Sequence, residues 1–290
     1  MFDPQRPTLK TSPATGRSLG VVWLSLGSVA IAELAARARP DAIVIDMQHG
    51  LWERRDLEAA IGVIPSNIPV IVRVAENTAL SIGTALDAGA EGVIVPLIET
   101  RKQAERAVRF AKYPPHGERS GGGVRPLQDF VNYVDAANQI VVMVMVETSK
   151  GLDNVNDIAA VDGIDMLFIG TGDLALSIGA FPKPSHDHAI ACADIHRATR
   201  DAWIPCGVFT GGVEMARARR DQGYRLVVIA NDIDLVQGGL NQSVARFRAP
   251  GEHSLQLASN GNLLSDAPPN TNKMLKAAPP ESAAARATKA

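Results

Sequence analysis

Three features of this 290-residue sequence predict an α/β fold of the (β/α)8 class, the TIM barrel. Eight short aliphatic runs recur along the chain, and segments with helical spacing of apolar residues separate most of them. The composition is 46% hydrophobic and only 4% aromatic, which suits parallel strands that are buried on both faces. The competing architecture is an open doubly wound sheet, but Gly27-Ser28 is not the glycine-rich phosphate loop usual after its first strand.

The predicted strands have β-branched or large aliphatic residues at successive positions, without alternating polar residues. Strands covered on both faces have this pattern, although periodicity alone does not separate them from buried helices. In chain order, the predicted strands are Gly20–Leu24, Ala42–Met47, Pro69–Val74, Gly92–Pro96, Ile140–Glu147, Asp165–Ile169, Pro205–Val208 and Leu226–Ile229.

The predicted helices are recognised by the residues that start and stop them. The first has Ser28 as a candidate cap and ends before Pro40, the second stops at Pro65, and the third has Asn77 as a cap and Gly89 beyond its end. In chain order, they are Ser28–Arg39, Glu53–Ile64, Asn77–Asp87, Thr100–Lys112, Asp187–Ala202, Gly212–Gln222 and Asp232–Phe247.

Two stretches interrupt this alternation. Tyr113–Asn138 is a long insertion, which we expect to be either a lid that brings Arg119 and Arg125 to the active site or a solvated loop. After residue 248 the chain becomes rich in Ala, Pro, Asn and Ser. We therefore divide the sequence into an N-terminal leader (1–19), a barrel domain (20–248) and a polar, largely disordered tail (249–290), with at most a short docking helix around Leu255.

Charge and composition exclude several classes of partner. Lys and Arg number 29 against 31 Asp and Glu, so the net charge of −2 favours neither nucleic acid nor an anionic membrane. The longest apolar run, Ile140–Val146, is far shorter than the roughly 20 residues of a membrane helix. Two cysteines exclude a disulfide scaffold, and the proline-containing N-terminus lacks the apolar core of a secretory signal. We expect a cytoplasmic protein.

Charged residues stand at the ends of the apolar strands, where a barrel carries its chemistry. Glu147 and Asp173 follow adjacent strands, so their oxygens can converge on one cation such as Mg²⁺ or Mn²⁺. The alternative is that both residues cap the helices that follow. A strand-borne lysine, which a Schiff-base enzyme would need, is absent from the predicted strands, and this favours metal chemistry.

His49 and Arg73 are the other candidates. His49 lies three residues after Asp46, which could orient the imidazole as a general base. Arg73 ends an apolar strand and needs an anion there, either a substrate oxyanion or Asp46 in a purely structural pair.

These residues stand in motifs that resemble the HpcH/HpaI-type aldolases, metal-dependent pyruvate aldolases typified by 2,4-dihydroxyhept-2-ene-1,7-dioate aldolase. The resemblance spans roughly residues 20 to 245 and is carried by IDMQHG (45–50), VRV (72–74), LDAGAEGVIVP (86–96), YPPHGERS (113–120), VETSKGLDNVNDI (146–158) and GIDMLFIGTGDLALSIG (163–179). It implies a (β/α)8 barrel, commonly assembled as a hexamer of paired barrels.

The resemblance also implies a role for each residue. Glu147 and Asp173 would bind the divalent metal, Mg²⁺ or Mn²⁺ with Co²⁺ as a further candidate. His49 would be the acid/base residue with Asp46 behind it, and Arg73 would hold the oxo group and the developing enolate. Backbone N–H groups of Gly172 and Asp173 would receive the carboxylate of the 2-oxo acid.

Three positions depart from the family pattern. Gln48, which we assign to substrate binding, stands where many members have Glu; Met145 and Thr171 replace a common Gln and Pro. Such neighbours of a metal site tune its affinity and substrate range. The expected activity is cleavage or formation of 4-hydroxy-2-oxo acids from 2-oxo acid and aldehyde substrates. The alternatives are a CoA-ester lyase of the citrate lyase β-subunit type and a catalytically silent barrel that serves as an assembly subunit.

Overall fold

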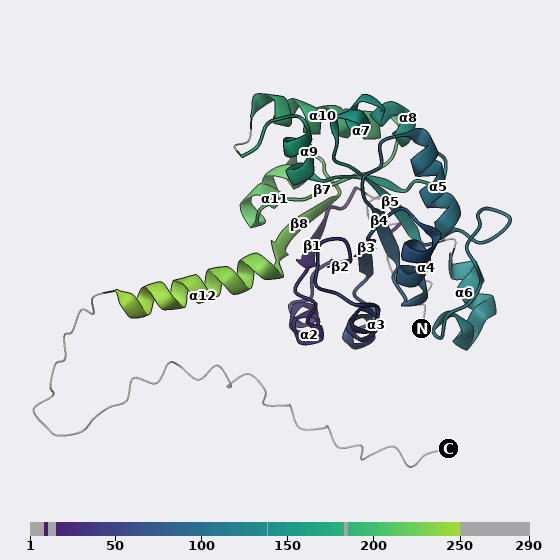
Figure 1. The fold of residues 1–290 in the computed structure, drawn as a ribbon, viewed down its shortest axis with the longest axis horizontal. Coiled ribbons are helices and arrows are strands. Elements are labelled where there is room, and N and C mark those ends of the chain that lie inside the picture. The colour runs from purple at the N-terminus through teal and green to yellow at the C-terminus, as the bar shows by residue number, and fades with distance from the viewer. Residues whose placement is uncertain (1–8, 11–15, 138, 183–184, 250–290) are drawn as a thin grey trace, which may run out of the picture. The chain divides into compact units, whose positions relative to one another are not determined.

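The predicted (β/α)8 barrel is confirmed by the computed structural model, which describes residues 9–10, 16–137, 139–182 and 185–249. The strands pair in parallel in the order β1 to β8, and β8 pairs with β1 to close the barrel (Figure 1). The strands are β1 (Leu19–Leu24), β2 (Ala42–Asp46), β3 (Val70–Arg73), β4 (Gly92–Val95), β5 (Val141–Val146), β6 (Met166–Ile169), β7 (Cys206–Val208) and β8 (Leu226–Asn231).

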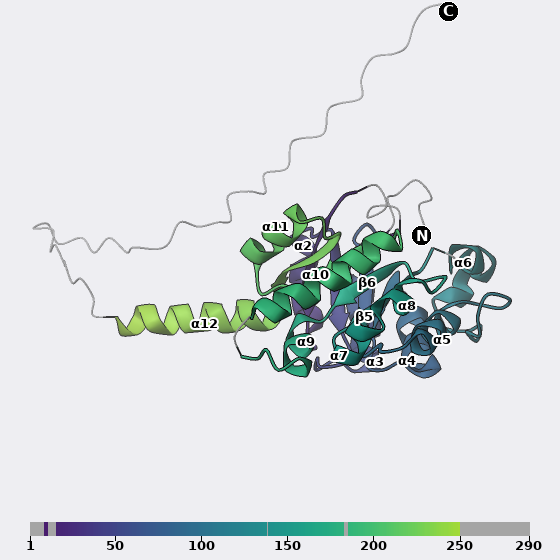
Figure 2. The same ribbon diagram turned by 90° about the horizontal axis from the view of Figure 1, so that it is seen from above.

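Helices α2 to α11 surround these strands in both views (Figures 1 and 2). The helices are α2 (Val29–Arg37), α3 (Arg54–Val63), α4 (Ala79–Asp87), α5 (Arg101–Ala111), α6 (Phe130–Ala137), α7 (Ser149–Asp153), α8 (Val155–Ala159), α9 (Thr171–Ser177), α10 (His186–Asp201), α11 (Val213–Asp221) and α12 (Asp232–Arg248), with a short 3-10 helix at Pro126–Asp129. Ser28, Thr78 and Thr100 cap α2, α4 and α5 through their side chains. The cap of α4 is thus Thr78 rather than the expected Asn77.

The core has two layers because β2 to β7 are buried on both faces, and β1 and β8 are buried over part of their length. A cluster inside the barrel includes Val44, Met143, Met145 and Phe168, and a larger cluster lies between the strands and the helices. The indole of Trp23 is 5.8 Å from the Phe168 ring, between centroids. Few aromatic side chains are needed to fill the barrel, which accounts for the low aromatic content.

The insertion at 113–138 lies at the amino end of the barrel. Arg119 from this segment pairs with Asp87 at 2.8 Å, and Asp87 is the last residue of α4, a helix that runs back from the carboxyl end of β3. Its guanidinium is buried between the rings of Tyr113 and Tyr133. Arg125 donates to backbone carbonyls of Glu58 and Ala88. The expectation that this segment is a lid at the active site was therefore wrong, and Arg119 is a packed rather than a solvated side chain.

The residue that follows the last strand fixes the loop that follows the first strand. Asp232, the buried first residue of α12, accepts hydrogen bonds from the N–H groups of Ser25 (2.9 and 3.0 Å) and Leu26 (2.9 Å). All residues of α12 after Asp232 are exposed, including Leu235 and Leu240.

The chain divides into two compact units, Met1–Ala245 and Arg246–Ala290. The structure describes only residues 246–249 of the second unit, so the docking helix expected around Leu255 lies outside the described residues. Within the described ranges, no helix has both the length and the apolarity needed to cross a membrane.

Candidate active site

The direction of the polar side chains of the site follows from the strand geometry, in which every second side chain points into the barrel. Val44 and Met145 belong to the interior cluster. Asp46 stands two positions after Val44 on β2, and Glu147 stands two positions after Met145, directly after the end of β5. Arg73 ends β3 next to Asp46, with which it is in register. Side chains from β2, β3 and β5 therefore point into the carboxyl-terminal mouth of the barrel, where the chemistry of such barrels takes place.

Asp46 and Arg73 form a buried bidentate ion pair. Arg73 Nε donates to Asp46 Oδ1 at 2.8 Å, and Nη2 donates to Oδ2 at 2.5 Å. The Arg73 guanidinium also lies over the ring of Trp23, 5.0 Å from its centroid. Asp46 accepts two of the five N–H bonds of a guanidinium and so holds Arg73 in one orientation, with the other donors left for an anion.

Asp46 contacts His49 through the backbone. Its Oδ1 accepts from the N–H groups of Gln48 (3.0 Å) and His49 (3.3 Å), and Ser25 Oγ donates to Oδ2 at 3.4 Å. Burial alone would raise the pKa of Asp46, but the hydrogen bonds and the charge of Arg73 hold it below its ordinary value. Asp46 thus orients the His49 loop and Arg73, whereas the expected Asp46 contact with the His49 imidazole is not among the hydrogen bonds of the described residues.

Glu147 is a buried carboxyl with few donors. Its Oε1 accepts from the N–H of Leu97 at 2.8 Å, and its Oε2 is buried without a hydrogen-bond partner in the described structure. Burial raises the pKa of Glu147 to about 7; the Leu97 N–H and the charge of Arg73 oppose the rise, and Asp173 adds to it. A buried carboxylate that is left without partners is costly, so Oε2 is suited to a cation.

Room for that oxygen depends on Gly170, the residue after β6. A Cβ at Gly170 would lie 2.4 Å from Glu147 Oε2, closer than such atoms approach. Asp173, three residues later, is half-buried, and it lies near enough for its charge to raise the pKa of the Glu147 carboxyl further. The structure therefore places Asp173 near the unpaired Oε2 of Glu147, so that the two carboxylates expected to bind the metal are neighbours.

Neither carboxylate has the alternative role of a helix cap. Thr148 caps α7, where its hydroxyl accepts from the N–H of Gly151 at 3.0 Å. Asp173 lies within the first turn of α9, a helix whose N-cap is Gly170, with no side-chain cap. The first-turn backbone of α9, with Gly172 and Asp173, is thus not covered by a capping side chain, as binding of a carboxylate there requires.

His49 and Gln48 lie in the turn after β2, at the same end of the barrel. His49 is exposed, so its imidazole is accessible to a substrate or to water. Gln48 is half-buried, and its Oε1 is buried without a hydrogen-bond partner in the described structure. Both side chains are placed where a substrate in the mouth of the barrel could meet them.

A cavity of about 320 Å³ opens beside the first turn of α9. Its lining is mainly apolar and includes Phe181, Pro182, Phe209 and Met215, together with Thr171 and Gly172. Thr171, which replaces the family's common Pro, donates from its hydroxyl to the carbonyl of Phe209 at 3.1 Å and so ties α9 to the end of β7.

Sequence reasoning missed three residues that shape this site: Leu97, Gly170 and Trp23. Leu97 adopts φ 55°, a left-handed conformation rare for leucine, and its N–H reaches Glu147. Its place after Pro96 at a strand end was the available signal. Gly170 follows an apolar strand in the same way, and Trp23 alternates with Val21 towards the interior.

The set of donors fits a small divalent cation. Among the described residues, no group of three or more His, Cys, Asp and Glu side chains could hold a metal. Mg²⁺ needs no such group, since it binds through one or two carboxylates and keeps waters or substrate oxygens as its other ligands. Glu147 and Asp173, with the orphaned Oε2, meet that requirement.

Residues 19–239 match the family described as HpcH/HpaI aldolase/citrate lyase. The chain belongs to this family. It is 36% identical over 260 residues to a hydroxypyruvate/pyruvate aldolase of Paraburkholderia phytofirmans, covering 85% of this chain and 98% of that one. It is 34% identical over 246 residues to a 4-hydroxy-2-oxovalerate aldolase of Rhodococcus jostii, covering 83% of this chain and 95% of the relative.

A solved structure agrees with these matches. An HpcH/HpaI aldolase/citrate lyase family protein from Burkholderia cenocepacia superposes with a TM-score of 0.78 at 34% identity, covering 83% of this chain and 99% of that one. The HpcH/HpaI family is metal-dependent in general. The expected family and its carbon–carbon lyase class, the aldolases, are thereby confirmed.

Proposed function

We propose that this protein is a metal-dependent aldolase that cleaves or forms 4-hydroxy-2-oxo acids, with pyruvate or a related 2-oxo acid as one product or donor. The observation that carries the proposal is the buried, unpaired Oε2 of Glu147 beside Asp173 at the carboxyl end of the barrel. The relatives named hydroxypyruvate/pyruvate aldolase and 4-hydroxy-2-oxovalerate aldolase support the substrate class.

Glu147 and Asp173 would hold the cation, with Mg²⁺ or Mn²⁺ as the first candidates and Co²⁺ as a third. A bound divalent cation would supply Lewis acidity, which polarises the 2-oxo group and stabilises negative charge on its oxygen. This role needs an anionic Glu147, so binding competes with the proton that burial favours on that carboxyl.

Arg73 and the first turn of α9 would bind the 2-oxo acid. The guanidinium of Arg73, oriented by Asp46, has N–H donors left for the 2-oxo oxygen and strengthens its hold as that oxygen becomes negative. The N–H groups of Gly172 and Asp173 would receive the carboxylate. The unpaired Oε1 of Gln48 is available to accept a hydrogen bond from a substrate hydroxyl or a water.

His49 would move the proton, directly or through a water. In the cleavage direction it takes the proton from the 4-hydroxyl, the C3–C4 bond breaks, and its electron pair enters the enolate of the 2-oxo acid while an aldehyde leaves. Protonation of the enolate at C3 then gives pyruvate or its analogue. In the synthetic direction the same groups act in reverse order.

The alternatives are less well supported. A CoA-ester lyase needs several basic contacts for the CoA phosphates, whereas Arg73 is the one Lys or Arg among the residues assigned to the described site. A silent assembly barrel would have no need for a buried carboxylate that lacks a partner. A Schiff-base aldolase needs a strand lysine, and none of the eight strands carries one.

Assembly and compartment are part of the same proposal. We expect a homo-oligomer, a hexamer or trimer of dimers, and the exposed apolar side chains of α12, such as Leu235, Leu240 and Val244, support burial against another copy. A cytoplasmic location is supported by Cys192 and Cys206, both of which are free and buried. Light scattering during size-exclusion chromatography measures the assembly directly.

The test of the aldolase is exchange of the methyl protons of pyruvate in heavy water, followed by NMR. We expect exchange with Mg²⁺, Mn²⁺ or Co²⁺ that stops when the metal is removed by a chelator. No exchange with any of the three ions would refute the proposal. A screen of aldehydes with pyruvate and hydroxypyruvate then identifies the acceptor.

A further inference from the structure

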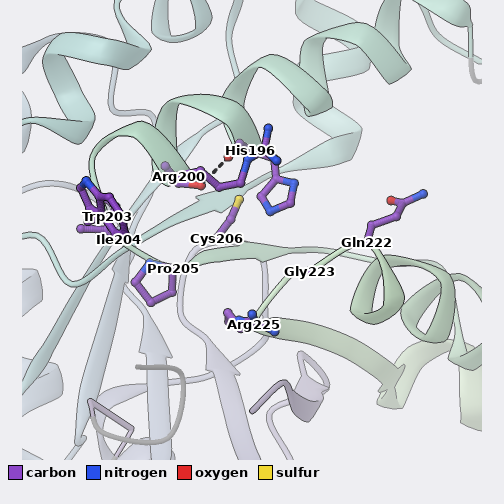
Figure 3. A pocket seen from close by; sticks show the side chains of 10 residues that line it. His196, Arg200, Trp203, Ile204, Pro205, Cys206, Gln222, Gly223 and Arg225 are labelled. Carbon is purple, nitrogen blue, oxygen red and sulfur yellow. Dashed lines mark hydrogen bonds between the residues drawn. The ribbon is translucent and has the colours of Figure 1, made fainter. Parts of the chain in front are cut away.

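A second cavity, of about 480 Å³, lies at the amino ends of β7 and β8. Pro205 and Arg225, which directly precede these strands, line it together with His196 and Arg200 from α10 (Figure 3). Asp46, Arg73 and Glu147 lie at the carboxyl ends of their strands, at the other end of the barrel. The volume is in the range of sites that bind small molecules, and no part of the aldolase chemistry uses it.

The charge of this cavity is positive and uncompensated. Arg200 and Arg225 line it, whereas no Asp or Glu does among the described residues. Neither arginine has an ion pair within the described structure. By contrast, the nearby Arg197 pairs with Asp194 at 2.8 Å on the same helix. Two guanidinium groups that share a concave site without a carboxylate favour an anion with several oxygens.

His196 adds a polar face to the cavity wall. Its imidazole stacks on the Tyr224 ring, with centroids 4.2 Å apart and planes 21° apart. Burial, and then the charges of Arg200, Arg225 and Arg219, hold the pKa of His196 below its usual value. The positive charges of the arginines therefore act on the imidazole, and an anion bound in the cavity would offset them.

Trp203 stands at the rim in an unusual conformation. It follows the end of α10 with φ 58°, a left-handed position that favours glycine, and its side chain is 94% exposed. The other two tryptophans of the chain, Trp23 and Trp52, are buried. A large aromatic ring that is both exposed and held at a strained backbone position points to a contact beyond the barrel itself.

We propose that this cavity binds a small organic phosphate that carries a planar group. Arg200 and Arg225 pair with the phosphate oxygens, and the planar group packs on Trp203 and on the apolar wall formed by Ile204 and Pro205. This inference is independent of the aldolase function, because the two sites share no residue and lie at opposite ends of the barrel.

Calorimetric titration of the whole, metal-free protein with inorganic phosphate and with phenyl phosphate tests the proposal. We expect one phenyl phosphate per chain, bound about three- to tenfold more tightly than inorganic phosphate. Arg200→Gln and Arg225→Gln should each weaken binding by at least about tenfold. Arg197→Gln, which changes a paired arginine on the same helix, should leave the affinity unchanged.

Tryptophan fluorescence gives a second readout. Phenyl phosphate should change the emission of the native protein but not of Trp203→Phe. Two results would overturn the proposal: no saturable binding of either compound up to about 10 mM, or equal affinity in the native protein and in Arg200→Gln. Since Arg200 is exposed, this variant is informative even if Arg225→Gln fails to fold.

Discussion

The ends of β2 and β5 each present a buried carboxyl group to the mouth of the barrel, and the two groups have opposite surroundings. Asp46 accepts from two nitrogens of Arg73 and from the backbone of Gln48 and His49, and its pKa is lowered. Glu147 accepts from one backbone N–H and keeps an unpaired oxygen, and its pKa is raised to about 7. A carboxylate whose oxygens all accept hydrogen bonds positions its neighbours, whereas a carboxylate with an unpaired oxygen is available to bind a cation.

The strongest test of this contrast is Glu147→Gln. The amide keeps the shape and can still accept from Leu97, but it removes the charge that a cation needs. We expect kcat/KM for aldol cleavage to fall by at least about 10³-fold, with calorimetry detecting no tight Mg²⁺ or Mn²⁺ binding. Circular dichroism serves as the control for folding. Wild-type turnover in this variant would refute the assignment of Glu147.

Asp46→Asn should act on stability and activity together. It leaves the buried guanidinium of Arg73 without its counter-charge, so we expect the free energy of unfolding in urea to fall by about 3 kcal/mol. Loss of the fixed Arg73 orientation should lower kcat/KM by about 10²-fold. The matched control is Arg101→Gln, which breaks an exposed pair with Glu105 and should change stability by less than about 0.5 kcal/mol. Equal stability losses in the two variants would contradict the contrast.

Gly170→Ala examines the space beside Glu147. The new Cβ would lie 2.4 Å from Oε2, so the carboxyl must shift and metal affinity should fall about 10- to 100-fold. Gly83→Ala in α4 is the control, because a Cβ there meets nothing within 4 Å. Titration with Mn²⁺, followed by electron paramagnetic resonance, measures both. Unchanged affinity in Gly170→Ala would place the cation elsewhere.

The smallest effect is a pH-dependent shift in Tm. The Glu147 carboxyl has a pKa of about 7 when folded against 4.5 as the ordinary value, so the metal-free protein should lose stability as the pH rises from 4.5 to 7. Each kcal/mol corresponds to about 2–4 °C in a chain of this size. Glu147→Gln should lack this loss. Asp46 has the opposite sign, since its lowered pKa gives stability that is lost only as the pH falls below 3.8.

Addition of Mg²⁺ should reverse the loss. At pH 7.5 the Glu147 carboxyl is mostly ionised and free to bind the cation, and Mg²⁺ at 100 times its Kd stabilises the fold by about 2.7 kcal/mol. At pH 5 the carboxyl stays protonated and the gain in Tm should be small. Scanning calorimetry at both pH values measures it; an equal gain at pH 5 would show that Glu147 is not a ligand.

Much of this contrast could be predicted from the sequence, because the spacing of apolar residues marks where each strand begins and ends. Strands buried on both faces give uninterrupted aliphatic runs, so the eight strands and the charged residues that end them could be located from the sequence. Local spacing does not reveal which charges meet. Asp46 is three residues from His49 in the chain, yet its carboxylate binds the guanidinium of Arg73 on the neighbouring strand, the alternative partner expected for Arg73.

Backbone groups and short helices were harder to predict. The donor to Glu147 is the backbone N–H of Leu97, in the loop after β4. The pattern of side chains in a sequence does not indicate which backbone N–H group a distant carboxylate will bind. Helices α7, α8 and α9 are five to seven residues long, too short for a periodic pattern to emerge. The segment 113–138 was misplaced although it follows a helix and precedes β5, an order that puts a loop at the amino end of the barrel. Its length favoured a functional lid instead.

The hydrogen bonds that Asp232 accepts from the loop after β1 determine when the site can form. Asp232 and Ser25 are 207 residues apart, and Ser25 is also a donor to Asp46. A ribosome that adds about 5–20 residues per second needs roughly 10–40 s to cover that distance. During that time β1 has no β8 to pair with, so its edge is open to other chains. The mouth of the barrel is therefore completed only after Asp232 has been synthesised.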